Sequence, residues 1–155
     1  MAVVAVEQTV DAPVANVWAS WDAFADIAKF NPLLRDSYLL KGSSDTGLGA
    51  LRQCDFSDGK TYIREKIIGY FPQKQLVLDI YEGTVPLKKA VATIDFKQLG
   101  ANRSKVTMRM EFEPKMGLIG RMMVPLMKRQ FSSNLGQLLA GNAAYVEGLA
   151  RRAAA

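Results

Sequence analysis

The last third of the chain, from Gly117 to about Arg151, has the spacing of one long helix with a single apolar stripe. At about 100° per residue, one broad sector of that helix holds Val124, Met127, Phe131, Leu135, Leu138, Tyr145, Val146 and Leu149. The opposite face is small or polar and carries Arg129, Ser133, Gly136, Ala140, Ala143 and Glu147. Because proline suits the first turn of a helix, we predict a short turn over 117–124 and a main helix from Pro125. Such a stripe must be buried against another layer, which the rest of the chain has to supply.

Three polar residues fall within or beside this stripe: Asn134, Asn142 and Lys128. A buried amide needs hydrogen-bond partners. Each asparagine therefore lies at the rim of the stripe, bonds to backbone or water, or faces a ligand.

The preceding residues indicate one strand, two short helices and six further strands. Helical spacing over 14–30 breaks near Asp22, with Asp11 as the expected cap and Pro13 in the first turn. The strands are expected at 3–10, 35–41, 48–56, 60–70, 76–82, 88–97 and 103–113. The last two strands alternate apolar and polar residues, so they have one buried and one wet face. The pattern predicts an α+β fold in which a curved antiparallel sheet of about seven strands wraps around the long helix.

The composition limits the number of domains and the kinds of catalytic or metal site that the chain can contain. The 155 residues predict a single domain, 1–155, and no apolar run approaches the roughly 20 residues that span a bilayer. The start of the chain lacks the basic region of a secretory signal, so we expect a cytoplasmic protein. The chain has no histidine, and Cys54 is its only cysteine. We therefore expect no metal, no cofactor, and none of the common histidine-based catalytic systems.

The positive charge is concentrated at the end of the chain. Residues 1–114 are balanced, whereas 115–155 carry Glu147 against six basic residues, Lys115, Arg121, Lys128, Arg129, Arg151 and Arg152. This helix either has a solvated basic face or attracts an anionic partner. Nucleic acid is not expected, because no aromatic and basic sheet face accompanies the charge.

A hairpin signal at Asp58-Gly59 predicts the register of two strands. A two-residue type I′ turn pairs Arg52 with Glu65 and Cys54 with Ile63, and it places Phe56 and Ile67 on the same face as these pairs. The Arg52–Glu65 pair is either an inner ion pair that could hold the polar end of a ligand, or an exposed pair near an edge.

Short motifs resemble those of the START-like, Bet v 1-related superfamily of helix-grip proteins, in its polyketide cyclase/dehydratase and lipid-transport branch. They are the opening strand followed by residues 10–18 (VDAPVANVW), the aromatic stretch Phe24 to Pro32 ending in Phe30-Asn31-Pro32, and Gly47-Leu48-Gly49. The resemblance implies a helix-grip fold that holds an apolar molecule between sheet and helix. It transfers no catalytic residue to this chain.

Six of the seven methionines lie in or near 108–127. They form either plain core or a pliable mouth for an apolar ligand. A third interpretation is that residues 116–129 touch a membrane transiently, through Leu118, Ile119, Met122 and Met123 together with Arg121, Lys128 and Arg129.

Together with the resemblance, these patterns predict a non-enzymatic carrier or sensor of a small hydrophobic molecule, such as a lipid, an isoprenoid or an aromatic polyketide-like compound. The alternative is a polyketide cyclase/dehydratase-type enzyme using polar cavity residues, and a third class is a protein-interaction module; either a monomer or a homodimer is expected. Tyr81 is a further candidate for orienting a ligand. The candidate cavity residues are Arg52, Cys54, Phe56, Ile63, Glu65, Ile94, Phe96, Met108, Met110, Met127, Phe131, Asn134, Leu138 and Asn142.

Overall fold

A computed structural model describes residues 1–154. In chain order its elements are β1 (Ala2–Val10), α1 (Val14–Asp22), the 3₁₀ helix η1 (Phe24–Lys29), β2 (Leu34–Leu39), β3 (Leu51–Phe56), β4 (Tyr62–Phe71), β5 (Gln75–Gly83), β6 (Leu87–Gly100), β7 (Arg103–Pro114) and α2 (Gly117–Ala154). The predicted elements are all present, and within residues 1–154 no helix is long and apolar enough to cross a bilayer.

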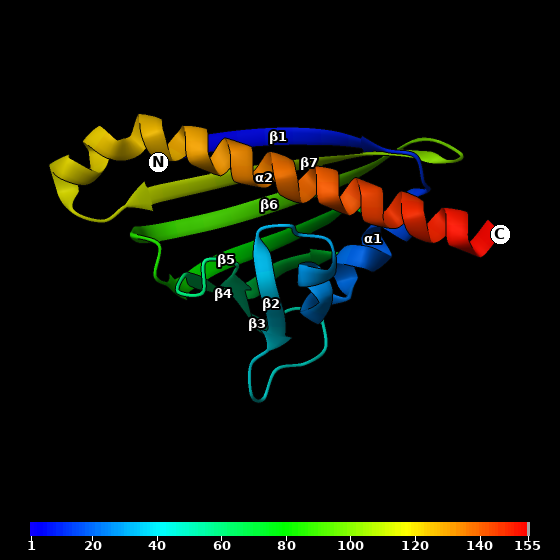
Figure 1. The fold of residues 1–155 in the computed structure, drawn as a ribbon, viewed down its shortest axis with the longest axis horizontal. Coiled ribbons are helices and arrows are strands. Elements are labelled where there is room, and N and C mark those ends of the chain that lie inside the picture. Colours follow the sequence, from blue (N-terminus) through cyan, green and yellow to red (C-terminus); the bar gives the residue numbers. More distant parts are fainter. Residues whose placement is uncertain (155) are drawn as a thin grey trace.

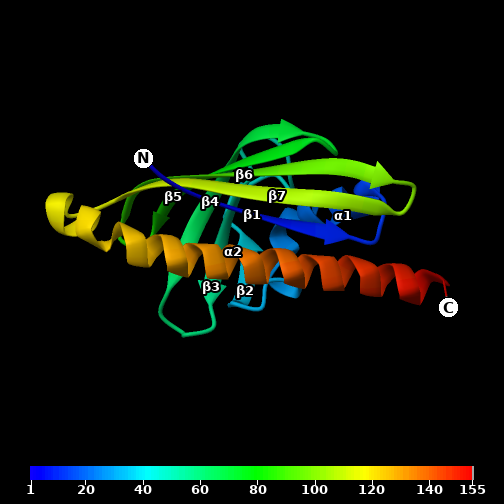
Figure 2. The same cartoon turned by 90° about the horizontal axis from the view of Figure 1, so that it is seen from above.

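The seven strands form one antiparallel sheet in the order β1-β7-β6-β5-β4-β3-β2. The sheet is strongly curved, and α2 lies across its concave side (Figure 1). Seen from above, α2 runs alongside the edge strand β1 (Figure 2). The predicted α+β helix-grip architecture is therefore confirmed.

The predicted pairing of β3 with β4 is confirmed, although the turn differs from the one expected. Arg52 pairs with Glu65 and Cys54 with Ile63. Gly59 has a positive φ of 78°, but Asp58 does not, which excludes a type I′ turn. The Gly59 N–H instead bonds to the Phe56 carbonyl, which centres the turn one residue earlier. The predicted register is still correct, because Phe56 pairs with Thr61 and the loop over 57–60 keeps its midpoint between Asp58 and Gly59.

Helix α2 departs from its prediction at Pro125, which lies inside one continuous helix rather than at its start. The first turns of α2 run at an angle to the rest (Figure 1). A proline inside a helix removes one backbone hydrogen bond and bends the axis. The helix therefore tolerates Pro125 at a bend.

The buried face of α2 is turned relative to the predicted stripe. Ala143 is buried although it was assigned to the polar face, whereas Leu149 is 42% exposed. Asn142 bonds to Ser20 of α1, and Glu147 accepts a hydrogen bond from the Asp11 backbone N–H at the end of β1. Because α2 packs against both α1 and β1, the face between these two contacts is covered.

The start of α1 also differs from the prediction. Pro13 takes the N-cap position, and no side chain caps the helix there. The Val14 N–H instead donates to Gln98 Oε1 at 2.7 Å. The side chain of Asp11 is therefore not a helix cap, because a distant strand supplies the acceptor.

Aromatic side chains fill one end of the space between the sheet and the helices. Trp18 and Phe96 pack edge to face with ring centres 5.3 Å apart, and Trp21 and Phe30 do so at 5.2 Å. Buried aromatic pairs of this kind leave little free volume. The free space between the sheet and α2 lies beyond Trp21, towards the N-terminal half of α2.

Candidate functional site

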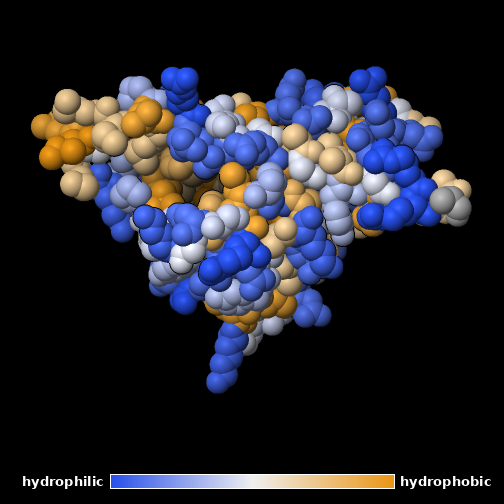
Figure 3. All heavy atoms as spheres, viewed as in Figure 1, coloured by the Kyte–Doolittle hydropathy of each residue, from blue (hydrophilic) through white to orange (hydrophobic). Residues whose placement is uncertain are grey.

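A cavity of about 450 Å³ lies between the concave face of the sheet, the middle of α2, and the η1–β2 region. Its volume falls within the range of small-molecule sites, about 300–1,000 Å³. The space-filling view shows an apolar recess beneath the N-terminal half of α2 (Figure 3). The fold therefore encloses a space in the region where the sequence placed a ligand.

The structure brings ten of the fourteen candidate residues to the wall of this cavity. They are Arg52, Cys54, Phe56, Ile63, Glu65, Met108, Met110, Phe131, Asn134 and Leu138. They come from β3, β4, β7 and α2, whose inward faces converge because the sheet is curved. The alternation of apolar and polar residues along these strands was sufficient to identify the face that lines the cavity.

The other four candidates lie outside the cavity. Ile94 and Phe96 point to the same side of β6 as Ala92, but they belong to the packed end, where Phe96 meets Trp18 and Trp21. Asn142 donates to the Ser20 hydroxyl at 2.8 Å. Met127 is half-buried against the core, and Tyr81, a further candidate, is 43% exposed.

The sequence reasoning missed the remaining lining residues, which are Trp21, Ile27, Asn31, Leu33, Leu34, Asp58, Thr61, Leu78, Ile80, Val85, Leu87, Ala92, Gln130 and Leu135. Leu78 and Ile80 could have been found by extending the inward alternation to β5, and Ala92 lies on the face of β6 that supplied the candidates Ile94 and Phe96. The residues of α1, η1 and β2 carried no such signal, because their position depends on how these short elements fold over the sheet.

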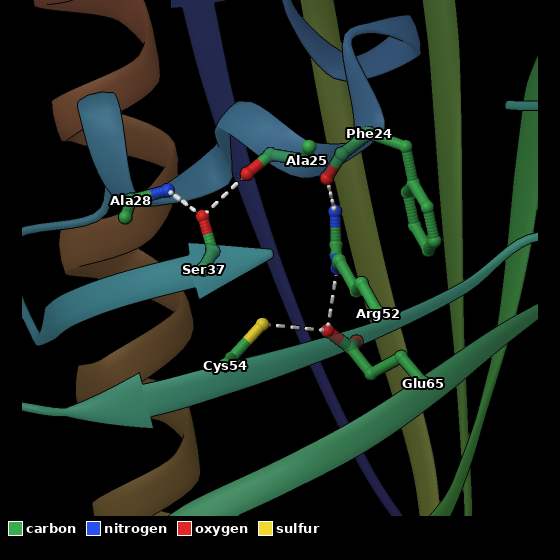
Figure 4. Close-up of polar contacts among 7 residues, drawn as sticks. All are labelled: Phe24, Ala25, Ala28, Ser37, Arg52, Cys54 and Glu65. Atoms are coloured by element: carbon green, nitrogen blue, oxygen red, sulfur yellow. Dashed lines mark hydrogen bonds and ion pairs between the residues drawn. The ribbon is translucent and has the colours of Figure 1, made fainter. Parts of the chain in front are cut away.

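Two hydrogen bonds of the Ser37 hydroxyl hold η1 against β2. The Ser37 hydroxyl donates to the Ala25 carbonyl at 2.6 Å and accepts the Ala28 N–H at 3.0 Å (Figure 4). This bridge holds the short 3₁₀ helix in place, and Ile27 of that helix lines the cavity. One wall of the site therefore depends on a serine that does not contact the cavity.

The polar centre of the cavity wall is a buried ion pair. Arg52 Nε donates to Glu65 Oε1 at 3.0 Å, and the two side chains are 1% and 7% exposed. Arg52 Nη1 donates to the Phe24 carbonyl at 2.9 Å, and the guanidinium lies 4.0 Å from the Phe24 ring centre. Figure 4 shows Arg52 reaching from β3 to the backbone of η1. The pair is an inner pair rather than an exposed one near an edge, which resolves the two alternatives.

Cys54 completes this cluster. Its Sγ lies 3.3 Å from Glu65 Oε1 and donates to it. Burial raises the pKa of the Cys54 thiol, and the neighbouring Glu65 carboxylate raises that pKa further. The thiol therefore stays protonated and acts as a weak donor rather than as a nucleophile.

Two buried N–H groups on the cavity wall lack a partner among the described residues: Arg52 Nη2 and Trp21 Nε1. An unpaired buried donor is unfavourable by about 1–3 kcal/mol. Both groups can donate to an acceptor atom, and neither can accept a hydrogen bond. Two residues of the cavity wall therefore carry a hydrogen-bond donor that no group among residues 1–154 satisfies. No three side chains within residues 1–154 are grouped so as to hold a metal ion.

Polar residues of the β3–β4 turn and of α2 also line the cavity. Gln130 Nε2 donates to Asn134 Oδ1 at 2.9 Å, and Asp58 and Gln130 are exposed. Hydrogen bonds from the Thr61 hydroxyl and backbone N–H, and from the Lys60 N–H, lower the Asp58 pKa to about 2. These residues form a hydrophilic rim, while the interior is mostly apolar.

Comparison with known proteins concerns the chain as a whole. A family model described as polyketide cyclase/dehydrase and lipid transport matches residues 1–147. No curated protein sequence matches the chain significantly.

Solved structures of the same fold are distant in sequence. A START superfamily protein from Mycobacterium smegmatis is 16% identical, with a TM-score of 0.79 over 95% of this chain and 98% of that one. The Zhui aromatase/cyclase from Streptomyces sp. R1128 is 14% identical, with a TM-score of 0.77 over 94% and 93%. Norcoclaurine synthase from Thalictrum flavum is 18% identical, with a TM-score of 0.72 over 95% and 87%. At such identities the likeness shows a shared fold.

Proposed function

Because the chain belongs to the polyketide cyclase/dehydrase and lipid transport family, we propose that it binds a small, mostly apolar molecule in the cavity beneath α2. The observation that carries this proposal is the combination of an apolar wall with two unpartnered donors, Arg52 Nη2 and Trp21 Nε1. Ligand sites commonly combine apolar walls with a few polar groups that fix orientation. The ligand class is a lipid, an isoprenoid or an aromatic polyketide-like compound that carries an oxygen acceptor.

The charge around these donors favours a neutral acceptor. The positive charge of Arg52 is already balanced by Glu65 at 3.0 Å. An anionic ligand would meet the Glu65 carboxylate in a medium of low dielectric constant, where like charges repel strongly. A ketone, ester or quinone carbonyl accepts the same hydrogen bonds without that repulsion.

The first experiment is native mass spectrometry of freshly purified protein, followed by solvent extraction and identification of any bound molecule. An extracted apolar compound with a carbonyl or ester oxygen is the expected result. A panel of lipids, isoprenoids and aromatic ketones is then titrated by calorimetry. Absence of both an adduct and any binding across the panel would overturn the proposal.

A matched ligand pair tests the role of the donors. Fluorenone and fluorene share one ring skeleton and differ by a carbonyl in place of a methylene group. We expect fluorenone to bind about tenfold or more tightly, because a hydrogen bond to a charged donor contributes about 1.5–3 kcal/mol. Trp21→Phe keeps the aromatic ring and removes one N–H, so it should reduce this preference. Equal binding of both compounds would show that the donors do not select the ligand.

The Arg52–Glu65 pair also supports a second candidate, a cyclase-type enzyme. A ketone held by Arg52 would be polarised, and the nearby Glu65 carboxylate could accept a proton from the adjacent carbon. A bound poly-β-ketone analogue would then be converted by the wild type and bound unchanged by Glu65→Gln. Recovery of unchanged analogue from both proteins would favour a carrier.

A further inference from the structure

The segment that leads into α2 exposes more apolar surface than folding explains. We call residues 115–129 the basic apolar segment. Its exposed side chains, each between 48% and 81% accessible, are Met116, Leu118, Ile119, Met122, Met123 and Leu126. The segment projects beyond the sheet at one end of the molecule, where apolar side chains gather on the surface (Figures 1 and 3). A contiguous exposed apolar patch of this kind marks an interaction surface.

The exposed side chains form one face of a helix. Leu118, Met122 and Leu126 follow one another at intervals of four, with Ile119 and Met123 beside them. Arg121 and Lys128 lie on one flank of this face at a spacing of seven residues. The segment is therefore amphipathic on its solvent side, in addition to the contact that α2 makes with the sheet.

Every charge within the segment is positive. Lys115, Arg121, Lys128 and Arg129 are all exposed, and no acidic residue occurs between 115 and 129. Glu113, two residues before it, already pairs with Lys88 at 3.5 Å. The surface therefore fits a partner that is both apolar and anionic.

Packing within the fold does not account for the apolar side chain of Met116. Its φ is 73°, a left-handed conformation that favours glycine, yet its side chain is 69% exposed and fills no core space. A residue other than glycine in this region is strained by about 1 kcal/mol or more. A strained, exposed methionine is consistent with a role in contact with a partner.

We propose that the basic apolar segment docks on an anionic lipid membrane, with its apolar face in the interfacial layer and its basic side chains at the headgroups. Interfacial helices combine these two features. A second copy of the chain fits less well, because a two-fold contact through this face would bring four basic residues from each copy together. The segment continues directly into Gln130, Phe131 and Asn134 of the cavity wall. Docking would therefore bring the cavity close to the membrane.

Vesicle sedimentation tests this proposal with the whole protein. Vesicles of phosphatidylcholine mixed with phosphatidylglycerol should bind the protein, pure phosphatidylcholine vesicles should bind it much more weakly, and added salt should weaken the binding. Arg121→Gln and Lys128→Gln should each lower the partition coefficient about fivefold. The double variant Leu118→Ser/Met122→Ser should lower it by about tenfold or more, because it removes apolar area from the contact.

Matched substitutions elsewhere on the surface distinguish docking through this segment from non-specific adsorption to vesicles. Leu48→Ser alters a leucine of similar exposure, 69% against 75% for Leu118, and Lys97→Gln removes an exposed charge from β6. Both should leave vesicle binding unchanged. Equal binding to neutral and anionic vesicles, or equal loss in the control variants, would overturn the proposal. Segment-dependent dimerisation without vesicle binding would overturn it in favour of a second copy. Fluorenone titrations of the same variants report on the cavity separately.

Discussion

Arg52 and Glu65 stabilise each other in a position where neither charge would be stable alone. Their side chains are 1% and 7% exposed, and Arg52 also holds the Phe24 carbonyl. In a buried ion pair, the attraction between the two charges offsets much of the free energy that is lost when they leave water. A single buried charge has no such compensation. The pair therefore matters for folding as well as for the cavity.

A double-mutant cycle tests this interdependence. Arg52→Met leaves the Glu65 carboxylate buried without its partner and should lower the free energy of unfolding by about 3–5 kcal/mol. Arg52→Met/Glu65→Met removes both charges and should recover most of that loss. Urea denaturation measures both. A double variant as unstable as the single one would show that the pair acts through its separate packing contacts.

Asp58 makes the stability of the β3–β4 turn depend on acid. Its folded pKa of about 2 lies below the ordinary aspartate pKa of 3.8, so the unfolded chain binds the proton more readily. The stabilisation is present above pH 3.8 and is lost as the pH falls towards 2. Asp58→Asn cannot ionise, so the stability difference between wild type and variant should shrink across that window. We expect acid titrations followed by circular dichroism to show this, and a constant difference would contradict it.

Helix α2 packs so closely against the Phe30–Pro32 segment, which follows η1, that residue 141 must be glycine. A Cβ on Gly141 would lie 2.1 Å from the Phe30 carbonyl oxygen and 3.1 Å from Pro32 Cδ. A Cβ on Gly136, one and a half turns earlier, would meet nothing within 4 Å. Packing therefore requires glycine at position 141 of this helix but not at position 136.

Two alanine substitutions should consequently have opposite effects. Gly141→Ala forces the helix away from Phe30 and Pro32 and should lower the free energy of unfolding by about 1–3 kcal/mol. Gly136→Ala improves helix propensity and should raise it by about 0.5–1 kcal/mol. Urea denaturation of both variants measures the difference. No change in stability for Gly141→Ala would mean that α2 can move away from Phe30 and Pro32 without loss of stability.

The fold as a whole leaves part of its concave side unfilled. The sheet, α2 and η1 enclose about 450 Å³ at one end, while the aromatic cluster fills the other. Ala90 and Ala92 are both buried on the same side of β6, and only Ala92 lines the cavity. Ala92 therefore borders free volume, whereas Ala90 borders packed core.

Leucine at each position tests the cavity directly. Ala92→Leu places its side chain in free space, so the free energy of unfolding should change by less than about 1 kcal/mol while fluorenone affinity falls tenfold or more. Ala90→Leu enters packed core opposite Phe112 and should lower the free energy of unfolding by about 1–3 kcal/mol. Calorimetric titration and urea denaturation measure the two effects. Comparable destabilisation by both variants would mean that the cavity collapses.

The strand faces and the Arg52–Glu65 pairing were predictable because they follow from periodicity and from one short loop. The predicted pairing was correct although the predicted turn type was wrong, because the loop over 57–60 has the same midpoint in both cases. The continuation of α2 through Pro125 and the turned face at Ala143 were not predictable, because both depend on what packs against the helix.

The sequence alone was sufficient for the order of elements, the inward faces of β3 and β7, and the apolar character of α2, since these depend on residues a few positions apart. Whether an inward residue meets a ligand space or a neighbour was decided only in three dimensions. Ala92 and Phe96 share a face of one strand, yet Phe96 packs against Trp18 and Ala92 faces the cavity. A cavity is the volume that distant elements leave between them, and local periodicity contains no measure of that volume.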